Sequence, residues 1–468
     1  MHSADSTPSP SIITRSPASA AQHFSSARCL YLIRAALILT QHHSLISFGF
    51  LPNRNDSELP ADMAVVATEH DATGRKLDLS KKTRGNHQRL RQIETAIRSF
   101  RVLRGLTPAQ VDNFMASYKI YSLDWAKEQE MIDALGEDYQ HVVGACLSDY
   151  YSVLNHLCAI GELEKMYIPP AIDLDESLTM NQVLYEENIA KELTLPPNAK
   201  VLDLGCGRGR VAAHISRIVG DAQVTGLNID ADQIASAKSF NKGMNLSNNF
   251  VCADFNDLPL PFPDNHFDGF YQIQAFSLSK DHNKLCQELY RVLKPGAKLS
   301  LLDWASLEAF DPEDPHHQKL MQRIKPLIGA VGTPTPKSLE AALESSGFTM
   351  LESNNASIDG LQAPLIERAD GYFRTARRAL LGLVRLGILP VHFRTLFNRL
   401  TQDCDAFVEA DRARLITTSY HWLAEKPLTP SAASSEMGLH VDSGYSSQTA
   451  VSASQSPASS DRVAKPEL

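Results

Sequence analysis

The chain has 468 residues, enough for two or three ordinary domains or for one large α/β domain with long ends. Its net charge of −9 and isoelectric point near 6.0 argue against nucleic acid as the main partner, because phosphate binding needs a basic surface. The seven cysteines include no C-x-x-C pair and no His spacing suited to zinc, which favours free thiols in a reducing compartment and predicts no metal site.

Both ends of the chain have compositions typical of segments that do not fold by themselves. Residues 3–26 are rich in Ser, Ala, Thr and Pro, and the tail 428–468 is again rich in Ser and Ala. Neither segment can bury enough apolar surface to become ordered. We therefore assign 1–62 as a disordered or targeting segment and 428–468 as a disordered tail.

The targeting interpretation of the first segment has three forms. An apolar run over residues 29–51 is interrupted by polar side chains and falls short of the roughly 20 apolar residues that a spanning helix needs. Residues 1–50 contain one acid, Asp5, among arginines and serines, which fits a mitochondrial presequence. A start of translation at Met63 is the third form, and the sequence does not choose among them.

Residues 63–180 are predicted to form a helical extension ahead of the main domain. Across 81–104 eight basic residues stand against one acid, Glu94, while apolar residues recur at helical spacing. Such a helix fits either an anionic membrane surface or a solvated position against the main domain. Thr107 and Pro108 predict the N-cap and the first residue of a further helix.

Strand and helix patterns alternate regularly through residues 181–427, which predicts an α/β domain with a doubly wound, Rossmann-like sheet. Seven strands are expected, in the segments 200–204, 223–228, 250–254, 268–273, 298–304, 348–352 and 414–426. Between the last two strands lies an insertion over about 356–412, which is far longer than a hairpin loop requires.

The stretch "VLDLGCGRGR" marks the first strand and the turn after it. Gly205, Gly207 and Gly209 leave room for a ligand at the start of the next helix. The spacing lacks the third glycine of a dinucleotide site, and an acid, Asp203, ends the strand. This D-x-G-x-G pattern resembles motif I of the class I S-adenosylmethionine (SAM) methyltransferases, with a surface turn in another α/β domain as the alternative.

Ligands of doubly wound sheets lie across the carboxyl ends of the strands, which places four segments in one crevice. Asn228 ends the second strand, where a ribose hydroxyl is expected, and Asp254 follows the third, where it could take an adenine amino group beside Phe255. A turn aspartate is the alternative for Asp254. The predicted cofactor-binding residues are Asp203, Gly205, Gly207, Asn228, Asp254, Phe255 and Gln272.

The insertion has a composition suited to a surface contact. Between Asp370 and Asp403 there is no acid, while six arginines alternate with apolar runs such as "ALLGLVRLGILP". One interpretation is a helical lid that admits a lipid substrate and rests on a membrane. The other is an interface with a second subunit.

Several stretches together resemble the sterol 24-C-methyltransferase family: "VLDLGCGRGR", "VTGLNIDADQIASAK", "FDGFYQIQAFS", "ELYRVLKPGAKLSLLDW", "DPEDPHHQKL" and the closing "AEKP". The similarity runs over about 181–427. It implies a seven-stranded class I methyltransferase fold, SAM as cofactor, and methyl transfer to a side-chain double bond of a sterol or sterol-like isoprenoid lipid. It also implies peripheral contact with an endoplasmic reticulum or lipid-droplet membrane, or a cytoplasmic location. A homo-oligomer is a further expectation.

The chain departs from the family at two places. The aromatic "YEYGWG"-like segment has only a partial counterpart in residues 149–151. Where the family carries Glu-Ala-Thr-Cys-His after the fourth strand, this chain has Gln274 through Leu278, so the ionisable pair is missing.

Alkene methylation needs no base at first, since π electrons attack a methyl group held in line about 3 Å away. The rate then depends on stabilising a carbocation, which aromatic faces can do and which Asp303 could assist by charge or by accepting a proton. The predicted catalytic residues are Tyr271, Gln274, Phe276, Asp303 and Tyr150. Core packing is the alternative for each aromatic residue. Methylation of a smaller natural product, with His156 or His282 as base, and a non-catalytic SAM- or lipid-binding homologue are the other functions left open.

Overall fold

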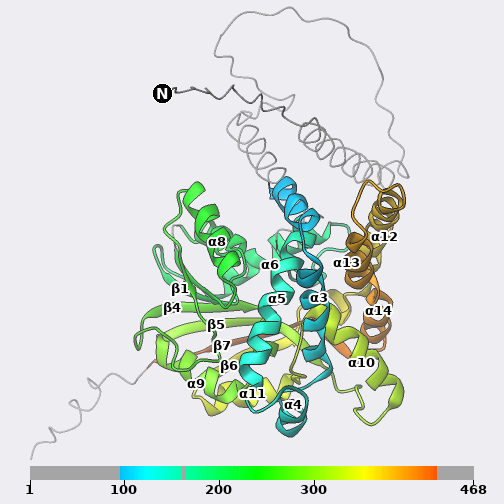
Figure 1. Cartoon of the computed structure of the whole chain (residues 1–468). Helices are drawn as coiled ribbons and strands as arrows, with labels where there is room; N and C mark the ends of the chain where they lie inside the picture. The colour runs from blue at the N-terminus through cyan, green and yellow to red at the C-terminus, as the bar shows by residue number, and fades with distance from the viewer. Residues whose placement is uncertain (1–94, 161–164, 221, 429–468) are drawn as a thin grey trace, which may run out of the picture. The chain divides into compact units, whose positions relative to one another are not determined.

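The computed structural model describes residues 95–160, 165–220 and 222–428 (Figure 1). The expectations for 1–62, for the first part of 81–104 and for the tail from 429 onward lie outside the described residues. Within the described residues, no helix is both long enough and apolar enough to span a bilayer.

The chain ahead of the sheet is helical, as the sequence predicted. Residues 95–104 are helical and are followed by α3 (Pro108–Ser117), η1 (Tyr118–Ser122), α4 (Glu128–Leu135), α5 (Tyr139–Ile160) and α6 (Leu178–Glu192). α3 begins where expected, because Thr107 Oγ1 accepts a hydrogen bond from the Gln110 amide and Gln110 Oε1 accepts one from the Thr107 amide. α6 crosses the predicted boundary at 180/181, and the domain limits stay predictions.

Seven strands form one sheet in the order β3-β2-β1-β4-β5-β7-β6. They are β1 (Lys200–Leu204), β2 (Gln223–Asn228), β3 (Asn249–Cys252), β4 (Phe267–Ile273), β5 (Leu293–Ser306), β6 (Thr349–Asn355) and β7 (Ile416–Glu425). The strands β1 to β5 are parallel to one another, and β7 is antiparallel to both β5 and β6. The expected Rossmann-like class I methyltransferase sheet is therefore confirmed.

Helices connect the strands and cover both faces of the sheet. They are α7 (Arg210–Ile218), α8 (Ala231–Gly243), η2 (Phe276–Leu278), α9 (His282–Val292), α10 (Pro315–Ile328), α11 (Pro336–Ser345), η3 (Ile358–Gly360), α12 (Ala363–Arg385), α13 (His392–Thr401) and α14 (Cys404–Arg412). Buried residues of β1 alternate between the faces: Val201 joins a core with α6, α7 and α8, and Leu202 joins one with α9 and α11. The helix α10 was not expected from the sequence.

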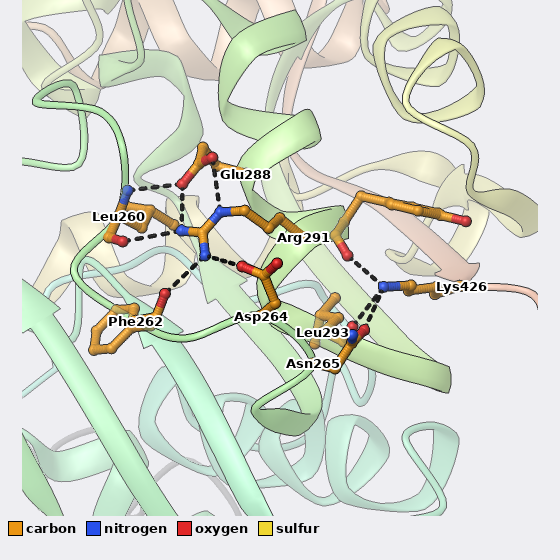
Figure 2. Close-up of polar contacts among 9 residues, drawn as sticks. Leu260, Phe262, Asp264, Asn265, Glu288, Arg291, Leu293 and Lys426 are labelled. Atoms are coloured by element: carbon orange, nitrogen blue, oxygen red, sulfur yellow. Dashed lines mark hydrogen bonds and ion pairs between the residues drawn. The ribbon is translucent and has the colours of Figure 1, made fainter.

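Two cations secure the end of the sheet that lies away from the glycine turn (Figure 2). The Arg291 guanidinium donates to Asp264 at 2.7 Å, to Glu288 at 2.7 Å and to the carbonyl oxygens of Leu260 and Phe262. Lys426, just beyond β7, donates to Asn265 Oδ1 and to the carbonyls of Tyr290 and Leu293 at 2.8 Å each. These bonds fix the loop between β3 and β4, whose first residues enter the predicted cofactor crevice.

The insertion between β6 and β7 forms three helices, α12, α13 and α14, which confirms the predicted helical insertion. Figure 1 shows them grouped beside the N-terminal helices, and the Phe100 and Phe393 rings lie 5.8 Å apart between the two regions. One buried cluster joins residues of α3 and α5 to residues of α12 and α13. Helices from the two ends of the folded region thus share a core.

Candidate active site

The carboxyl ends of β1, β2 and β4 border a pocket of about 120 Å³. Six of the seven predicted cofactor-binding residues line it together: Asp203, Gly205, Gly207, Asn228, Asp254 and Phe255. The seventh, Gln272, is fully buried and donates a hydrogen bond to Asp303 Oδ2 at 2.9 Å instead of facing the pocket. We call this space the cofactor pocket.

The glycine turn takes its shape from backbone conformations that other residues rarely adopt. Gly205, Gly207 and Gly209 have φ of 75°, 51° and 67°. A Cβ on Gly205 would also lie 2.5 Å from the Cβ of Ala275, in the segment that follows β4. The turn therefore needs glycine both for its backbone and for its close approach to the neighbouring chain.

Asp203 is the buried carboxylate of the cofactor pocket. Its Oδ2 accepts a hydrogen bond from the Tyr271 hydroxyl at 2.8 Å. Burial raises the pKa of Asp203 to about 7, against the opposing effect of that hydrogen bond. A ligand cation beside this carboxylate would stabilise its ionised form, in addition to the hydrogen bond that Tyr271 donates.

Three hydrogen-bond acceptors lie at or beyond the end of β2, and one of them has no hydrogen-bond partner among the described residues. Asn228 Oδ1 accepts the Asp230 amide at 3.0 Å, and Asp230 caps α8 by accepting the amides of Asp232 and Gln233. Gln233 Oε1, in contrast, is buried and has no hydrogen-bond partner among the described residues, although Gln233 lines the pocket. Sequence analysis missed Gln233, which the spacing of the glycine turn did not indicate.

Asp254 has the turn geometry weighed for it and also lies at the cofactor pocket. Its Oδ1 accepts hydrogen bonds from the amide and side-chain nitrogens of Asn256, at 2.9 and 3.1 Å, which is the geometry of a turn aspartate. Asp254 also lines the pocket next to Phe255, and burial raises its pKa. Its binding role stays a prediction.

A second, larger cavity of about 240 Å³ lies between helices on the other side of the 165–168 segment. Its walls come from α5, α10, α12, α13 and α14 and are mainly apolar, with Leu154, Leu327, Leu380, Phe397 and Phe407 among the lining residues. We call this space the apolar chamber. Most of its residues stand in no sequence motif, and only their packing brings them together.

Five residues line both the cofactor pocket and the apolar chamber: Tyr151, Lys165, Met166, Tyr167 and Gln274. They come from α5, from the segment between α5 and α6, and from the end of β4. Of these, sequence analysis predicted only Gln274 as a site residue and placed Tyr151 in the 149–151 segment that partly matches the family's aromatic segment. Tyr151 follows Tyr150, a predicted catalytic residue that lines the chamber but not the cofactor pocket. The Tyr150 ring packs among the rings of Phe114, Tyr118, Tyr121 and Tyr151.

Gln274 fastens the 165–170 segment to the sheet. Its Oε1 accepts the Ile168 amide at 3.1 Å, and its Nε2 donates to the carbonyls of Ile168 and Thr418 at 2.7 Å each. A glutamate could not donate these two bonds. The chain's departure from the family at this position therefore has a physical role, because the amide holds one wall that both cavities share.

Two other predicted catalytic residues lie behind the cavity walls. Asp303 Oδ2 accepts hydrogen bonds from the Phe276 amide at 2.6 Å and from Gln272, and its Oδ1 accepts one from the Trp304 amide at 2.8 Å. Burial raises the pKa of Asp303 to about 6. Neither Phe276 nor Asp303 lines either cavity, so this geometry suits them to fixing the segment after β4, and their catalytic roles stay predictions.

A buried ion cluster supports the shared wall from behind. The Glu186 carboxylate on α6 receives Lys165 Nζ at 2.6 Å, His214 Nδ1 at 2.6 Å and the Tyr167 hydroxyl at 2.8 Å. Lys165 also lines both cavities, while its ammonium donates to both carboxylate oxygens of Glu186. No sequence motif indicates this cluster, because its members come from separate elements.

A glycine turn, a buried acid and an acceptor set lie across the carboxyl ends of parallel strands, as motif I of a SAM-dependent methyltransferase predicts. Residues 202–301 match the methyltransferase domain family. Cycloartenol-C-24-methyltransferase of Arabidopsis thaliana is 34% identical over 276 residues, which covers 54% of this chain and 78% of the relative. The chain belongs to the sterol C-24 methyltransferase family, as a divergent member.

Two further relatives have slightly lower sequence identity to this chain. Sterol 24-C-methyltransferase of Pneumocystis carinii is 30% identical and covers 54% of this chain and 72% of the relative. Botryococcene C-methyltransferase of Botryococcus braunii is 29% identical and covers 54% of this chain and 68% of the relative. The matched family is thus represented by proteins named for two different kinds of acceptor.

The pocket residues fit SAM, the cofactor of this class of enzyme. Asp203 would offer a buried carboxylate to the α-ammonium group, and the glycine turn would leave space for the methionine portion. The orphaned Gln233 Oε1 can accept a hydrogen bond from a ribose hydroxyl, next to Asn228.

Proposed function

We propose that this enzyme transfers the methyl group of SAM to a carbon–carbon double bond in the side chain of a sterol or sterol-like isoprenoid lipid. The observation that carries the proposal is the apolar chamber, which shares five lining residues with the cofactor pocket. A long hydrocarbon fits such a chamber better than a polar acceptor, because its walls offer mainly apolar side chains. The relatives named for sterol and botryococcene methylation support an isoprenoid acceptor.

The side chains around the shared wall suit methylation at carbon. SAM supplies an electrophilic methyl group on a sulfonium when it is bound. An alkene donates its π electrons to that methyl group without prior loss of a proton, whereas a hydroxyl acceptor gains from a positioned base. Among the described residues that line either cavity there is no histidine. His156 bonds Ser99 Oγ and His282 bonds the Phe276 carbonyl, both away from the shared wall.

The shared wall can stabilise the cation that forms on the neighbouring carbon. Tyr151 and Tyr167 bring aromatic rings to the point where the cavities meet, and an aromatic face attracts a cation by roughly 0.5–2 kcal/mol. Loss of a proton from the adjacent carbon to solvent water then restores a double bond. Gln274 cannot accept that proton as the family glutamate would, because a neutral amide is not a base, and its Nε2 donates to the carbonyls of Ile168 and Thr418.

The test uses the full chain, methyl-labelled SAM and two sterols that share one nucleus. One sterol carries the Δ24 double bond, and its control has the same side chain saturated. We expect label in the extracted sterol only from the unsaturated compound, with a mass gain of one methylene group. Absence of label in the presence of intact SAM binding would overturn the proposal.

The same assay separates the two other candidate functions. A methyltransferase of a smaller natural product would bind SAM and ignore both sterols. A non-catalytic homologue would bind SAM and sterol, seen as a shift in melting temperature, without turnover. We also propose that the enzyme meets its acceptor at a membrane, as a peripheral protein of the endoplasmic reticulum or lipid droplets.

A further inference from the structure

We propose that the turn between α12 and α13 docks on an anionic lipid bilayer and that its residues form the contact. The turn exposes two large apolar side chains, Leu386 with 74% and Val391 with 63% of their surface accessible. Arg385 and Arg394 stand beside them in the sequence, and both are exposed. We call these four residues the docking tip. The benefit of docking for catalysis rests on the proposed lipid substrate. Docking itself can be measured without turnover.

The charge around the docking tip favours an anionic surface. Residues 371–402 contain six arginines and no acid. Three of the arginines are already engaged: Arg374 pairs with Asp370, Arg377 bonds Asn398, and Arg399 pairs with Asp403. The other three are Arg378, Arg385 and Arg394, which are exposed and have no ion pair among the described residues. Each such cation near an anionic membrane contributes about 1 kcal/mol.

The docking tip is held rigidly from below. Leu389 and Phe393, which flank Val391, are buried in the core cluster. His392 Nε2 lies 2.7 Å from the Leu103 carbonyl oxygen, which ties the start of α13 to the helix at 95–104. Leu386 and Val391 therefore remain outside a core that is already packed, and their exposure does not come from a loosely held loop.

The two helices that carry the docking tip also form part of the wall of the apolar chamber. Leu380 of α12 and Phe397 and Leu400 of α13 line the chamber, while Arg378, Arg385 and Arg394 of the same helices face outward. Figure 1 shows α12 and α13 next to one another. A lipid that leaves a bilayer at the tip would thus reach the chamber along one helix pair.

A bilayer suits this surface better than a second copy of the chain. A two-fold interface brings the same patch of each subunit together, so the unpaired arginines of both copies would meet. Anionic headgroups instead supply charge opposite to the arginines, and the acyl region accepts Leu386 and Val391.

The test is flotation of the full chain with vesicles of phosphatidylcholine alone or with phosphatidylserine added. We expect the wild-type protein to float with the anionic vesicles and to be released by salt. The L386D/V391D and R385Q/R394Q double variants should each bind at least roughly tenfold more weakly. The control is L351D, which places the same charge at a side chain that is 47% exposed on β6, and it should bind as the wild type does.

Three results would overturn the proposal: no binding of the wild type to anionic vesicles, equal binding of the tip variants, or a tip variant that turns a dimer into a monomer in light scattering. The last result would assign the tip to a subunit interface. A second readout separates docking from substrate identity. The tip variants should slow methylation of a sterol embedded in vesicles and leave methylation of a cyclodextrin-delivered sterol unchanged. If no sterol is methylated, the proposed function fails while flotation still decides docking.

Discussion

The cofactor pocket and the apolar chamber share one wall but are assembled in opposite ways. The cofactor pocket comes from the ends of neighbouring parallel strands, where a few consecutive residues set the backbone and the charge. The chamber comes from helices as far apart in the sequence as α5 and α14. A single substitution in the pocket should therefore change SAM binding strongly, whereas one in the chamber should change acceptor binding only slightly. A substitution in the shared wall should affect both the pocket and the chamber.

The largest effect is expected from Asp203→Asn. The asparagine keeps an acceptor for the Tyr271 hydroxyl but loses the charge that pairs with the ammonium of SAM. A buried charge pair of this kind is worth about 2–5 kcal/mol, so the dissociation constant for SAM should rise roughly 100-fold. Calorimetric titration measures this. Asp257→Asn is the control, because Asp257 is exposed and lines neither cavity. If D203N binds SAM with the same dissociation constant as the wild type, Asp203 does not contribute to SAM binding.

The glycine turn offers the sharpest test of local backbone control. Gly205→Ala would place a methyl group 2.5 Å from the Cβ of Ala275 at a φ of +75°, and the combined strain and overlap should cost about 3 kcal/mol of unfolding free energy. Gly220→Ala is the matched control, since Gly220 has a similar φ of +65° and no atom within 4 Å of the added Cβ. Its cost should be about 1 kcal/mol. Chemical denaturation compares the two, and equal losses would show that crowding at the turn is unimportant.

The shared wall is tested by Gln274→Glu. The substitution removes two donated hydrogen bonds and sets a carboxylate against the carbonyls of Ile168 and Thr418, which should cost about 2–3 kcal/mol of stability. We expect kcat/KM for the lipid acceptor to fall roughly 30-fold while SAM affinity changes less. Gln318→Glu is the control, because Gln318 Nε2 donates to the Pro312 carbonyl at an exposed site. A variant with restored family-like activity would show instead that Glu at this position acts as the base.

The same contrast explains what the sequence could predict. The glycine turn, Asp203, Asn228 and Asp254 were found because strand ends and turn chemistry are local, and parallel strands bring their ends to one edge. Lys165 and Tyr167 were missed because only tertiary packing places them at the shared wall. Tyr151 was found only as part of the 149–151 segment and was not predicted as a site residue. Asp303 and Gln272 were assigned to the site by their positions on β5 and β4, yet both side chains are used in hydrogen bonds behind it.

A smaller effect is expected from pH. Burial raises the pKa of Asp203 from 3.8 to about 7, and SAM prefers the ionised carboxylate. Affinity for SAM should therefore fall about tenfold from pH 8 to pH 6 in the wild type and stay nearly flat in D203N. The stability of the chain without ligand depends on pH in the opposite direction. The folded chain without ligand binds an extra proton between the two pKa values, so this contribution of Asp203 to stability is lost as pH rises towards 7. At pH 8, D203N should melt a few degrees above the wild type.

The smallest effect is expected at Tyr151, one of the five residues that line both the cofactor pocket and the apolar chamber. Tyr151→Leu removes the aromatic face but keeps an apolar side chain, so kcat for the lipid acceptor should fall several-fold, in line with roughly 0.5–2 kcal/mol for a cation over a ring. Tyr151→Phe keeps the face and should retain most of the activity. Single-turnover assays with saturating SAM separate this from binding. If Phe and Leu reduce kcat equally, the hydroxyl matters and the ring does not, and the shared wall then acts through polar contacts such as those of Gln274.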